Sequence, residues 1–304
     1  MNFFNLKNKI NYLKISLKKF ILNEGNVCPS CNSKHLSTIE RKYLITSLKR
    51  CKNCELLFRA PTTTHEENKI FYQEDYSEGF TTDCPNNEEL EILKNNNFIS
   101  TDKDYTRYIE ILKKIKNEYN HNNLKLFDYG CSWGYGSYQL QKEFNVTGYE
   151  ISSPRARYAI EKLNINVLNK KDLEKLENTE NVFDIFFMSH VLEHLPNPKK
   201  TLEFAMKVLK KDGYLISFTP NGSFAHKKLA KNWSQLWGNV HPNFIDEKFY
   251  SKHFENNKYY IGSTSRLKKK PFFYYQPTIE NFLKAPSQLI DDISGAELLI
   301  IAKK

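Results

Sequence analysis

Four cysteines near the N-terminus have the spacing of a metal site. Cys28 and Cys31 form one C-x2-C pair, and Cys51 and Cys54 form a second after nineteen intervening residues. Two such pairs supply the four thiolates, at tetrahedral spacing, that structural zinc requires. A site closed by four protein ligands leaves no position for water or substrate, so we expect structural Zn2+. The alternative is two disulfides, which a chain without an export signal disfavours.

A second group of residues has the pattern of a nucleotide-binding βα turn. Residues 124–144, LKLFDYGCSWGYGSYQLQKEF, form a short apolar strand, a glycine-rich turn and a helical pattern. Glycine allows a sharp turn and lets a ligand approach the backbone N–H groups closely. The next strand ends in Glu150, twenty-two residues after Asp128. An acid there is placed to accept hydrogen bonds from both ribose hydroxyls.

Strands and helices continue to alternate along the chain. A short strand precedes Asp172, which either caps the following helix or faces an adenine amino group. The segment 182–191, VFDIFFMSHV, is almost continuously apolar, as a parallel strand covered on both faces should be. A helix that Gly213 terminates and a fifth strand from Tyr214 to Thr219 follow. This alternation predicts an α/β fold with a parallel, doubly wound sheet.

These segments resemble the successive motifs of class I S-adenosylmethionine-dependent methyltransferases. The matching motifs are DYGCSWGYG, YEIS, FDIFFMSHVLEHLPNP and LKKDGYLISFTPN. The earlier LKRCKNCELLFRAP is similar to the second knuckle of methyltransferases that carry an N-terminal zinc ribbon, many of which modify sugars or polysaccharides. One departure is Ser132, where the family usually has a glycine.

The resemblance implies S-adenosylmethionine as cofactor and a Rossmann-like sheet whose last strand, in ELLIIAKK, is antiparallel. In the family the glycine turn holds the methionine part, the acid after strand two holds the ribose, and the loop after strand three flanks the adenine. Trp133 is expected to cover the cofactor. The expected cofactor-binding residues are Asp128, Gly130, Cys131, Gly134, Glu150, Asp172, Met188 and Ser189.

Three histidines are candidates for a general base near the methyl acceptor: His190, His194 and His241. The first two, with Glu193, also spell H-x-x-E-H, the order of an inverted zinc-peptidase motif. Such a peptidase helix needs a third protein ligand, and here two prolines follow within one turn, which disfavours metal catalysis. The alternative for His190 and His194 is simple hydrogen bonding at the start of a helix.

Aromatic residues interrupt the βα rhythm after the fifth strand. Trp233, Trp237, His241 and Phe244 form either a stacking surface for a cyclic acceptor or the small core of a lid. The expected organisation is a basic amphipathic helix over 1–24, the ribbon over 25–62, a helical connector over 63–120, and a methyltransferase domain over 121–304 with an acceptor-side insertion at about 221–290.

Composition and charge restrict the class of protein. The 304 residues are 40% hydrophobic, which excludes a wholly disordered chain, and the net charge of +10 favours anionic partners. Lysines interleave with apolar residues over 1–24, and no segment approaches a membrane span. We therefore expect a cytoplasmic protein, and peripheral contact with the inner membrane surface through residues 1–24 is left open.

The leading hypothesis is O-methylation of a sugar, nucleotide sugar or glycan precursor, so the expected partner is a small-molecule or glycan acceptor. An RNA methyltransferase with a zinc module is the first alternative, because the charge is positive. The segment TPNG after strand five lacks the motif that amino-methylating nucleic-acid enzymes use. A sugar C-methyltransferase is a closer rival, and a non-catalytic zinc-ribbon binding protein is least favoured.

Overall fold

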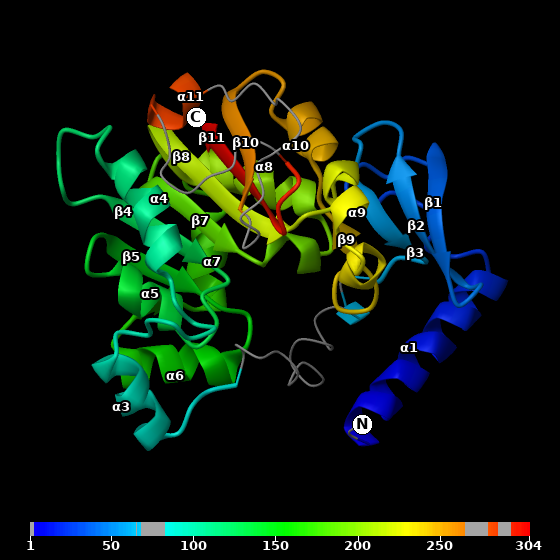
Figure 1. The fold of residues 1–304 in the computed structure, drawn as a ribbon, viewed down its shortest axis with the longest axis horizontal. Helices are drawn as coiled ribbons and strands as arrows, with labels where there is room; N and C mark the ends of the chain where they lie inside the picture. The colour runs from blue at the N-terminus through cyan, green and yellow to red at the C-terminus, as the bar shows by residue number, and fades with distance from the viewer. Residues whose placement is uncertain (1–2, 65, 68–82, 265–278, 285–292) are drawn as a thin grey trace.

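The computed structural model describes residues 3–64, 66–67, 83–264, 279–284 and 293–304. Within these residues a seven-stranded sheet forms the centre of the larger part of the molecule (Figure 1). Its strands are β4 (Lys125–Tyr129), β5 (Asn145–Tyr149), β6 (Asn166–Leu168), β7 (Phe183–Ser189), β8 (Leu209–Pro220), β10 (Lys258–Thr264) and β11 (Glu297–Lys303).

The strand order is β10-β11-β8-β7-β4-β5-β6. Strands β4 to β8 pair in parallel, whereas β11 is antiparallel to both of its neighbours. The order reverses at β4, so the carboxyl ends of β4 and β7 meet at a switch point, where open α/β sheets bind ligands. The predicted α/β fold with an antiparallel last strand is confirmed.

Helices cover both faces of this sheet. Phe127 and Phe186 belong to a buried cluster with α7, α8 and α10, while Leu126 and Phe187 belong to another with α4, α5 and α11. Neighbouring residues of a strand point to opposite faces, so continuous apolar runs build both clusters. The helices are α3 (Asn87–Asn95), α4 (Thr106–Lys116), α5 (Tyr135–Leu140), α6 (Ser153–Leu163), α7 (Lys170–Leu176), α8 (Pro198–Val208), α9 (Phe224–Leu229), α10 (Glu247–His253) and α11 (Glu280–Lys284), with 3-10 turns η2 (Leu192–His194) and η3 (Trp233–Leu236).

The cysteine-containing segment forms a second, antiparallel sheet of order β1-β2-β3-β9. Strands β1 (Leu36–Lys42), β2 (Thr46–Cys51) and β3 (Leu57–Ala60) come from this segment, but β9 (Asn243–Phe244) comes from the segment after β8. Across the junction, Arg50 Nη2 lies 2.5 Å from Asp246 Oδ2, and both side chains are buried. The small sheet is therefore fixed to the larger part of the molecule and not merely tethered to it.

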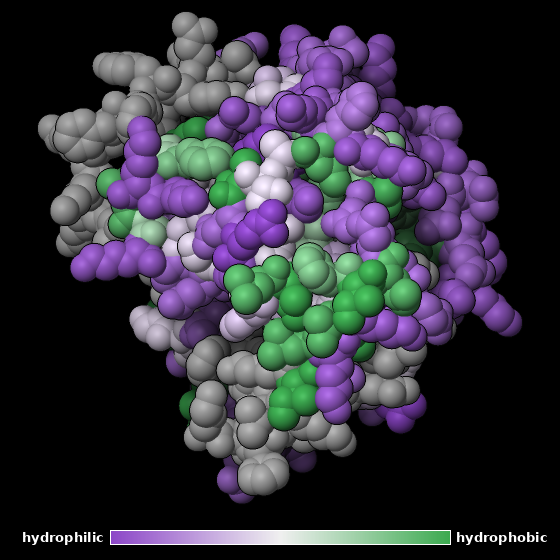
Figure 2. All heavy atoms as spheres, turned by 90° about the vertical axis from the view of Figure 1, so that its right-hand side faces the viewer, coloured by the Kyte–Doolittle hydropathy of each residue, from purple (hydrophilic) through white to green (hydrophobic). Residues whose placement is uncertain are grey.

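The N-terminal helix α1 (Phe3–Ile21) leaves apolar side chains in solvent. Lys19 donates to the Thr62 carbonyl and pairs with Glu67, which ties the helix to the end of the small sheet. The face that carries α1 shows a hydrophobic area among hydrophilic side chains (Figure 2). Among the described residues, no helix combines the length and apolarity needed to cross a bilayer. Peripheral membrane contact through residues 1–24 stays a prediction. The exposed apolar residues of this segment include Ile10, Ile15, Leu17, Phe20, Ile21 and Leu22.

Three sequence-based boundaries need correction. Gly213 does not end a helix: α8 ends at Val208, and Gly213 lies in an irregular part of β8, where a Cβ would lie 3.0 Å from the Asp184 carbonyl oxygen. Helix α4 packs on the large sheet and is more than a connector. The expected insertion at 221–290 contains β10, a strand of the large sheet, and its residues 265–278 and 285–290 lie outside the described part.

Candidate functional site

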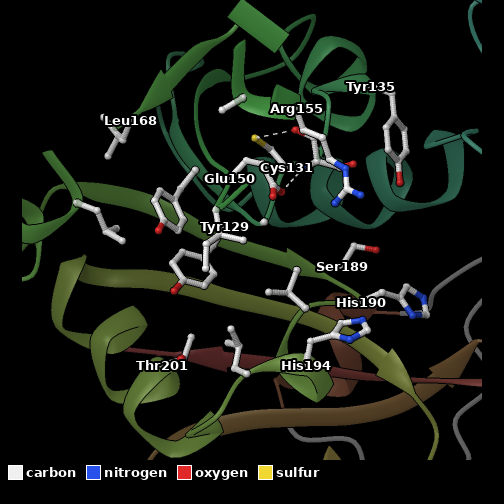
Figure 3. Close-up of a pocket in the computed structure, with 18 of the residues that line it drawn as sticks. Tyr129, Cys131, Tyr135, Glu150, Arg155, Leu168, Ser189, His190, His194 and Thr201 are labelled. Atoms are coloured by element: carbon white, nitrogen blue, oxygen red, sulfur yellow. Dashed lines mark hydrogen bonds between the residues drawn. The ribbon is translucent and has the colours of Figure 1, made fainter. Parts of the chain in front are cut away.

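A cavity of about 2040 Å³ opens at the carboxyl ends of the parallel strands. Gly130 follows β4, Glu150 follows β5, Asn169 follows β6, and His190 follows β7, and all four line it. Figure 3 shows Glu150, Cys131 and Arg155 on one side and His190 and His194 on the other. The topology thus gathers four strand-end residues that are up to sixty positions apart in the sequence.

The Glu150 carboxylate organises the turn after β4. It accepts hydrogen bonds from the backbone N–H of Ser132 at 3.0 Å and of Ser152 at 2.8 Å. Burial raises the pKa of Glu150. Ser132 has a φ of +52°, a left-handed conformation that suits glycine, which gives a physical reason for the glycine that the family resemblance leads one to expect here. The site accepts serine at a modest energetic cost.

Gly130 is required where the turn passes the opposite wall. Its φ is +89°, and a Cβ built on it would lie 2.4 Å from a methyl carbon of Val191. Its N–H and that of Cys131 both donate to the Tyr149 carbonyl, which binds the turn to β5. Cys131 lines the cavity but is 4% exposed, and burial raises the pKa of its thiol.

Four predicted cofactor residues do not line the cavity. Asp128 is buried and accepts a hydrogen bond from the Ser137 hydroxyl at 2.6 Å, and its pKa rises to about 7 because of burial. Gly134, with φ +89°, allows α5 to approach Ala159. Met188 is fully buried in the core, whereas its neighbour Ser189 lines the cavity. The fourth residue is Asp172.

Asp172 does not cap α7 with its side chain and does not line the cavity. Asn169 caps α7 by accepting from the Asp172 N–H at 3.0 Å, and Asn169 lines the cavity. The Asp172 side chain instead pairs with Lys175 at the surface. Trp133, expected to cover the cofactor, is fully buried in a small cluster with Phe98. An Asn that directly follows a short strand was the signal for the correct cap.

Sequence reasoning also missed several residues of the cavity wall. The rings of Tyr129 and Tyr149 stack with centroids 5.3 Å apart, and both line the cavity beside Leu168. Each tyrosine directly precedes a residue that was identified, Gly130 or Glu150, so strand-end position was the available signal. Arg155, on α6, lines the same wall.

His190 belongs to an ion-pair network centred on Glu297. Its Nε2 lies 2.7 Å from Glu297 Oε1, and Arg107 Nη2 lies 2.6 Å from the same oxygen. Burial opposes charge on both partners. Despite this, contacts with Glu193 and Glu297 raise the pKa of His190 to about 10, and His190 and Arg107 lower that of Glu297 to about 2. His190 is therefore a cation at neutral pH and a poor general base.

This network predicts a defined pH window. The raised pKa of His190 stabilises the fold below its ordinary value of about 6.5, and this contribution is lost as pH rises through about 10. The lowered pKa of Glu297 stabilises the fold above about 4.3, and this contribution is lost as pH falls through about 2. Glu297→Gln should therefore lower the pKa of His190 by about 1–3 units.

An NMR titration of the histidine ring signals measures this change. Glu255→Gln is the matched control, because that carboxylate pairs with Lys252 at the exposed surface and not with a histidine. An unaltered His190 titration in Glu297→Gln would contradict the network.

His194 and His241 form a second group at the cavity. Their ring centroids lie 4.8 Å apart, and His194 Nε2 lies 3.7 Å from Glu193 Oε1. Burial lowers the pKa of His194 to about 4, in spite of Glu193, so its ring is neutral at pH 7. Burial favours a neutral Glu193, but His194 and His190 outweigh it and lower the pKa of Glu193. The structure therefore places His194 beside His241. His190 differs from His194 because it carries a positive charge at neutral pH.

A family model described as a methyltransferase domain matches residues 101–261, more than half of the 304 residues. The chain belongs to this methyltransferase family. The uncharacterized protein MJ1123 of Methanocaldococcus jannaschii is 40% identical over 88 residues, which span 29% of this chain and 42% of that protein. The match thus covers less than half the length of this curated relative.

Solved structures give weaker similarities. A methyltransferase of Thermotoga maritima, described as S-adenosylmethionine-dependent and possibly a histamine N-methyltransferase, has 18% identity and a TM-score of 0.45 over 71% of this chain and 95% of that chain. An S-adenosylmethionine-dependent methyltransferase from Archaeoglobus fulgidus has 18% identity and a TM-score of 0.42 over 72% of this chain and 100% of that chain.

The aromatic residues that follow β8 in the methyltransferase form a core and not a stacking surface. Trp233, Trp237 and Phe244 are at most 2% exposed and pack against Leu48 and Leu57 of the small sheet. Of the four residues considered for the acceptor surface, His241 alone lines the cavity. The interpretation as the lid's own core is correct for the other three.

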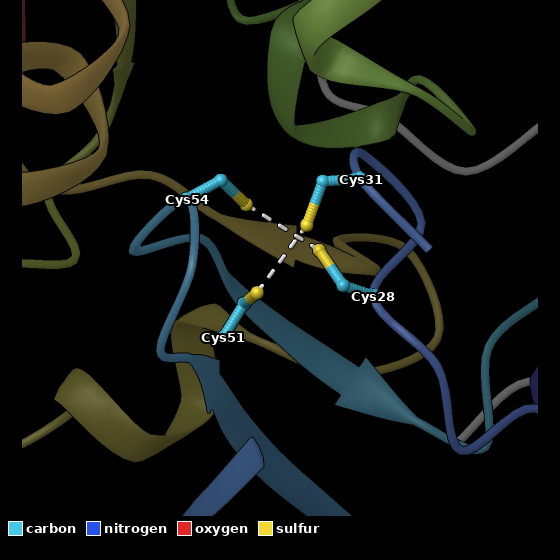
Figure 4. Close-up of side chains that lie close together, drawn as sticks. All are labelled: Cys28, Cys31, Cys51 and Cys54. Carbon is cyan, nitrogen blue, oxygen red and sulfur yellow. Dashed lines mark hydrogen bonds between the residues drawn. The ribbon is translucent and has the colours of Figure 1, made fainter. Parts of the chain in front are cut away.

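The four cysteines of the methyltransferase converge at one end of the small sheet (Figure 4). The Sγ atoms of Cys28 and Cys54 lie 3.5 Å apart, as do those of Cys31 and Cys51, and all four lie within 4.8 Å of one another. Sulfurs bound at 2.3 Å to one tetrahedral ion would lie about 3.8 Å apart. No disulfide joins the cysteines, all of which fall in the described part of the chain. The donor set therefore fits zinc.

Proposed function

We propose that the protein transfers a methyl group from S-adenosylmethionine to a hydroxyl of a sugar, nucleotide sugar or glycan precursor. One observation carries this proposal. In a chain of the methyltransferase family, the cavity that holds Glu150 and Gly130 on one wall holds His194 and His241 on another. A cofactor and an acceptor can therefore meet in one cavity.

The first wall suits the cofactor. When bound, S-adenosylmethionine supplies an activated methyl group on its sulfonium, so the protein has mainly to align the reactants. Glu150 would accept hydrogen bonds from the ribose hydroxyls, and the backbone at Gly130 would approach the methionine part. Asn169, which takes the position expected of Asp172, would flank the adenine. Asp128 and Gly134 would act indirectly, by shaping the turn.

The second wall suits the acceptor. His194 Nδ1 donates to the Val240 carbonyl, and His241 Nδ1 donates to the Leu236 carbonyl, each at 2.8 Å, because a carbonyl oxygen can only accept. Each Nε2 therefore keeps a lone pair and can take a hydroxyl proton. We assign the base to one of these two rings and a positioning role to the cationic His190.

The acceptor class rests on the resemblance to ribbon-bearing sugar methyltransferases. The cavity lining includes Arg157, Lys170 and Lys200 but contains more carboxylates than basic side chains. The charge of the cavity therefore does not select between a nucleotide sugar, a glycan and RNA.

We also propose that residues 25–62 form a zinc ribbon that supports this second wall, and that residues 121–304 together with α4 form the catalytic domain. The four thiols provide the donor set that structural zinc prefers. Strand β3 of the ribbon pairs with β9, and the Arg59 N–H donates to the Pro242 carbonyl at 2.8 Å. Pro242 directly follows His241, so the ribbon fixes the chain beside a proposed catalytic ring.

Transfer of labelled methyl from S-adenosylmethionine into fractionated host extract tests the function. Label in nucleotide-sugar or glycan fractions would support it, and chemical cleavage of the product would distinguish O-methyl from C-methyl groups. Label in ribonuclease-sensitive material would replace it with the RNA alternative. Absence of both transfer and cofactor binding would favour the non-catalytic binding protein. Glu150→Gln is the control for cofactor-dependent transfer.

A further inference from the structure

Glu193 has a buried carboxylate without a hydrogen-bond donor. Its side chain is 1% exposed, and among the described residues neither oxygen accepts a hydrogen bond. The nearest ring nitrogens, of His190 and His194, lie 3.4 and 3.7 Å from Oε1. A buried polar atom without a hydrogen bond costs about 1–3 kcal/mol, and more when charged. Cationic His190 lies closer to Glu297 than to Glu193, so the Glu193 carboxylate can still accept a further positively charged partner.

Two imidazoles are oriented toward the same place. The ligand atoms of Glu193, His194 and His241 all lie within 4.8 Å of one another. Each ring donates its Nδ1–H to a backbone carbonyl, at Val240 or Leu236, and keeps the Nε2 lone pair. Metal-binding histidines characteristically make this second hydrogen bond, which fixes tautomer and ring orientation.

The three residues are held by a rigid junction. Glu193 and His194 lie on η2, which begins three residues after the end of β7, and His241 lies two residues before β9. The buried Asn243 donates to the Leu195 carbonyl at 2.6 Å, which ties β9 to η2. The Gly238 N–H donates to the His241 carbonyl at 3.0 Å. Such support favours a preorganised site.

We propose that Glu193, His194 and His241 bind a divalent transition metal whose open coordination positions face the cavity and bind oxygen atoms of the methyl acceptor. Two imidazoles and one carboxylate are a ligand set for such ions. His194 and His241 line the cavity, so a metal there would contact an acceptor. This role rests on the proposed function, whereas metal binding itself does not.

The metal would lower the pKa of a coordinated acceptor hydroxyl, as it does for bound water. In the transfer, the acceptor oxygen forms a bond to the methyl carbon while the carbon–sulfur bond breaks. The electron pair of that bond remains on sulfur, which becomes a neutral thioether. With the metal bound, the Nε2 atoms of His194 and His241 are its ligands, so the metal takes the place of the ring base and the hydroxyl proton leaves to solvent. The peptidase interpretation of H-x-x-E-H is not supported, because the segment forms a short 3-10 turn.

Cobalt binding tests the site. We would dialyse the zinc-loaded full chain against Co²⁺, remove free metal, and measure bound cobalt and the visible spectrum. The expected result is one Co²⁺ per chain with the weak bands of nitrogen and oxygen ligands and without thiolate charge transfer. His241→Ala and the near-isosteric Glu193→Gln should each weaken binding by at least 10–100-fold, roughly the effect of losing only a supporting residue.

His121→Asn is the matched control, because His121 is exposed and lies outside this group. Equal cobalt binding by wild type, His241→Ala and Glu193→Gln would overturn the proposal, as would cobalt held only by thiolates. Calorimetry with S-adenosylmethionine separates the two proposals. Cobalt binding without cofactor binding would refute the proposed function alone, and cofactor binding without cobalt binding would refute the metal site alone. Circular dichroism would verify that each variant folds.

Discussion

Cys51→Ser is expected to abolish zinc binding, to unfold residues 25–62, and to displace His241 from the cavity. Cys51 ends β2, is fully buried, and lies in the cluster that also contains Phe58 and Phe249. Structural zinc contributes an apparent ~10–16 kcal/mol to the folding of small zinc domains. Because β3 pairs with β9, loss of the ribbon would also release the chain after His241.

Elemental analysis and hydrogen exchange measure the two parts of this prediction. Zinc should be absent, and amide protection should be lost in β2, β3 and β9 but retained in β4 and β7, which belong to the other sheet. Cys84→Ser is the matched control, because Cys84 is exposed and stands outside the four-cysteine group. A Cys51→Ser protein that keeps its zinc and its protection would contradict both the assignment of the metal and the coupling.

The coupling gives the ribbon a function in the architecture. In the described part of the chain, β9 is the one strand that the segment after β8 contributes to the small sheet. The buried Arg50 and Asp246 pair strengthens the same junction, and breaking such a pair typically costs 3–5 kcal/mol. The proposed ribbon would then serve as a scaffold for the proposed acceptor wall, without requiring that it bind nucleic acid.

Local patterns in the sequence were enough to predict the central sheet and one wall of the cavity. Apolar runs and turn residues defined β4, β5 and β7, and the glycine turn with its distant acid identified Gly130 and Glu150. These signals extend over a few residues, and the parallel βα rhythm then determines where strand ends meet. The choice between Met188 and Ser189 could also have been made, since neighbouring strand residues face opposite sides.

For the other wall the sequence named His190, His194 and His241, which line the cavity, but it could not predict their partners, because these come from distant segments. Glu297 meets His190 across 107 positions, on a strand whose place beside β8 no local pattern fixes. His241 approaches Glu193 and His194 because β9 joins the ribbon sheet, and a two-residue strand has no recognisable period. The sequence therefore showed Glu193 and His194 side by side, while the fold brings His241 to them from the following segment.

Glu150→Gln is expected to reduce the affinity for S-adenosylmethionine by about 10²–10⁴-fold. Two hydrogen bonds from ribose hydroxyls to a carboxylate are worth about 1.5–3 kcal/mol each, and every 1.4 kcal/mol corresponds to a tenfold change in affinity. The variant also presents an amide NH2 group to one of the two backbone N–H donors, of Ser132 and Ser152, that the carboxylate now satisfies. Isothermal titration calorimetry would measure the change.

A comparison with Asp172→Asn tests whether Asp172 contacts the adenine, as the sequence suggested, or only pairs with Lys175 at the surface, as the structure indicates. A role for Asp172 at the adenine requires weaker binding in that variant, whereas its position at the surface beside Lys175 predicts unchanged affinity. Glu180→Gln, at an exposed carboxylate, is the control for a change of charge.

Because burial raises the pKa of Glu150, wild-type affinity should fall as pH decreases through that raised value, and Glu150→Gln should lack this dependence. Equal affinities of wild type and Glu150→Gln would remove the ribose contact from the proposed site.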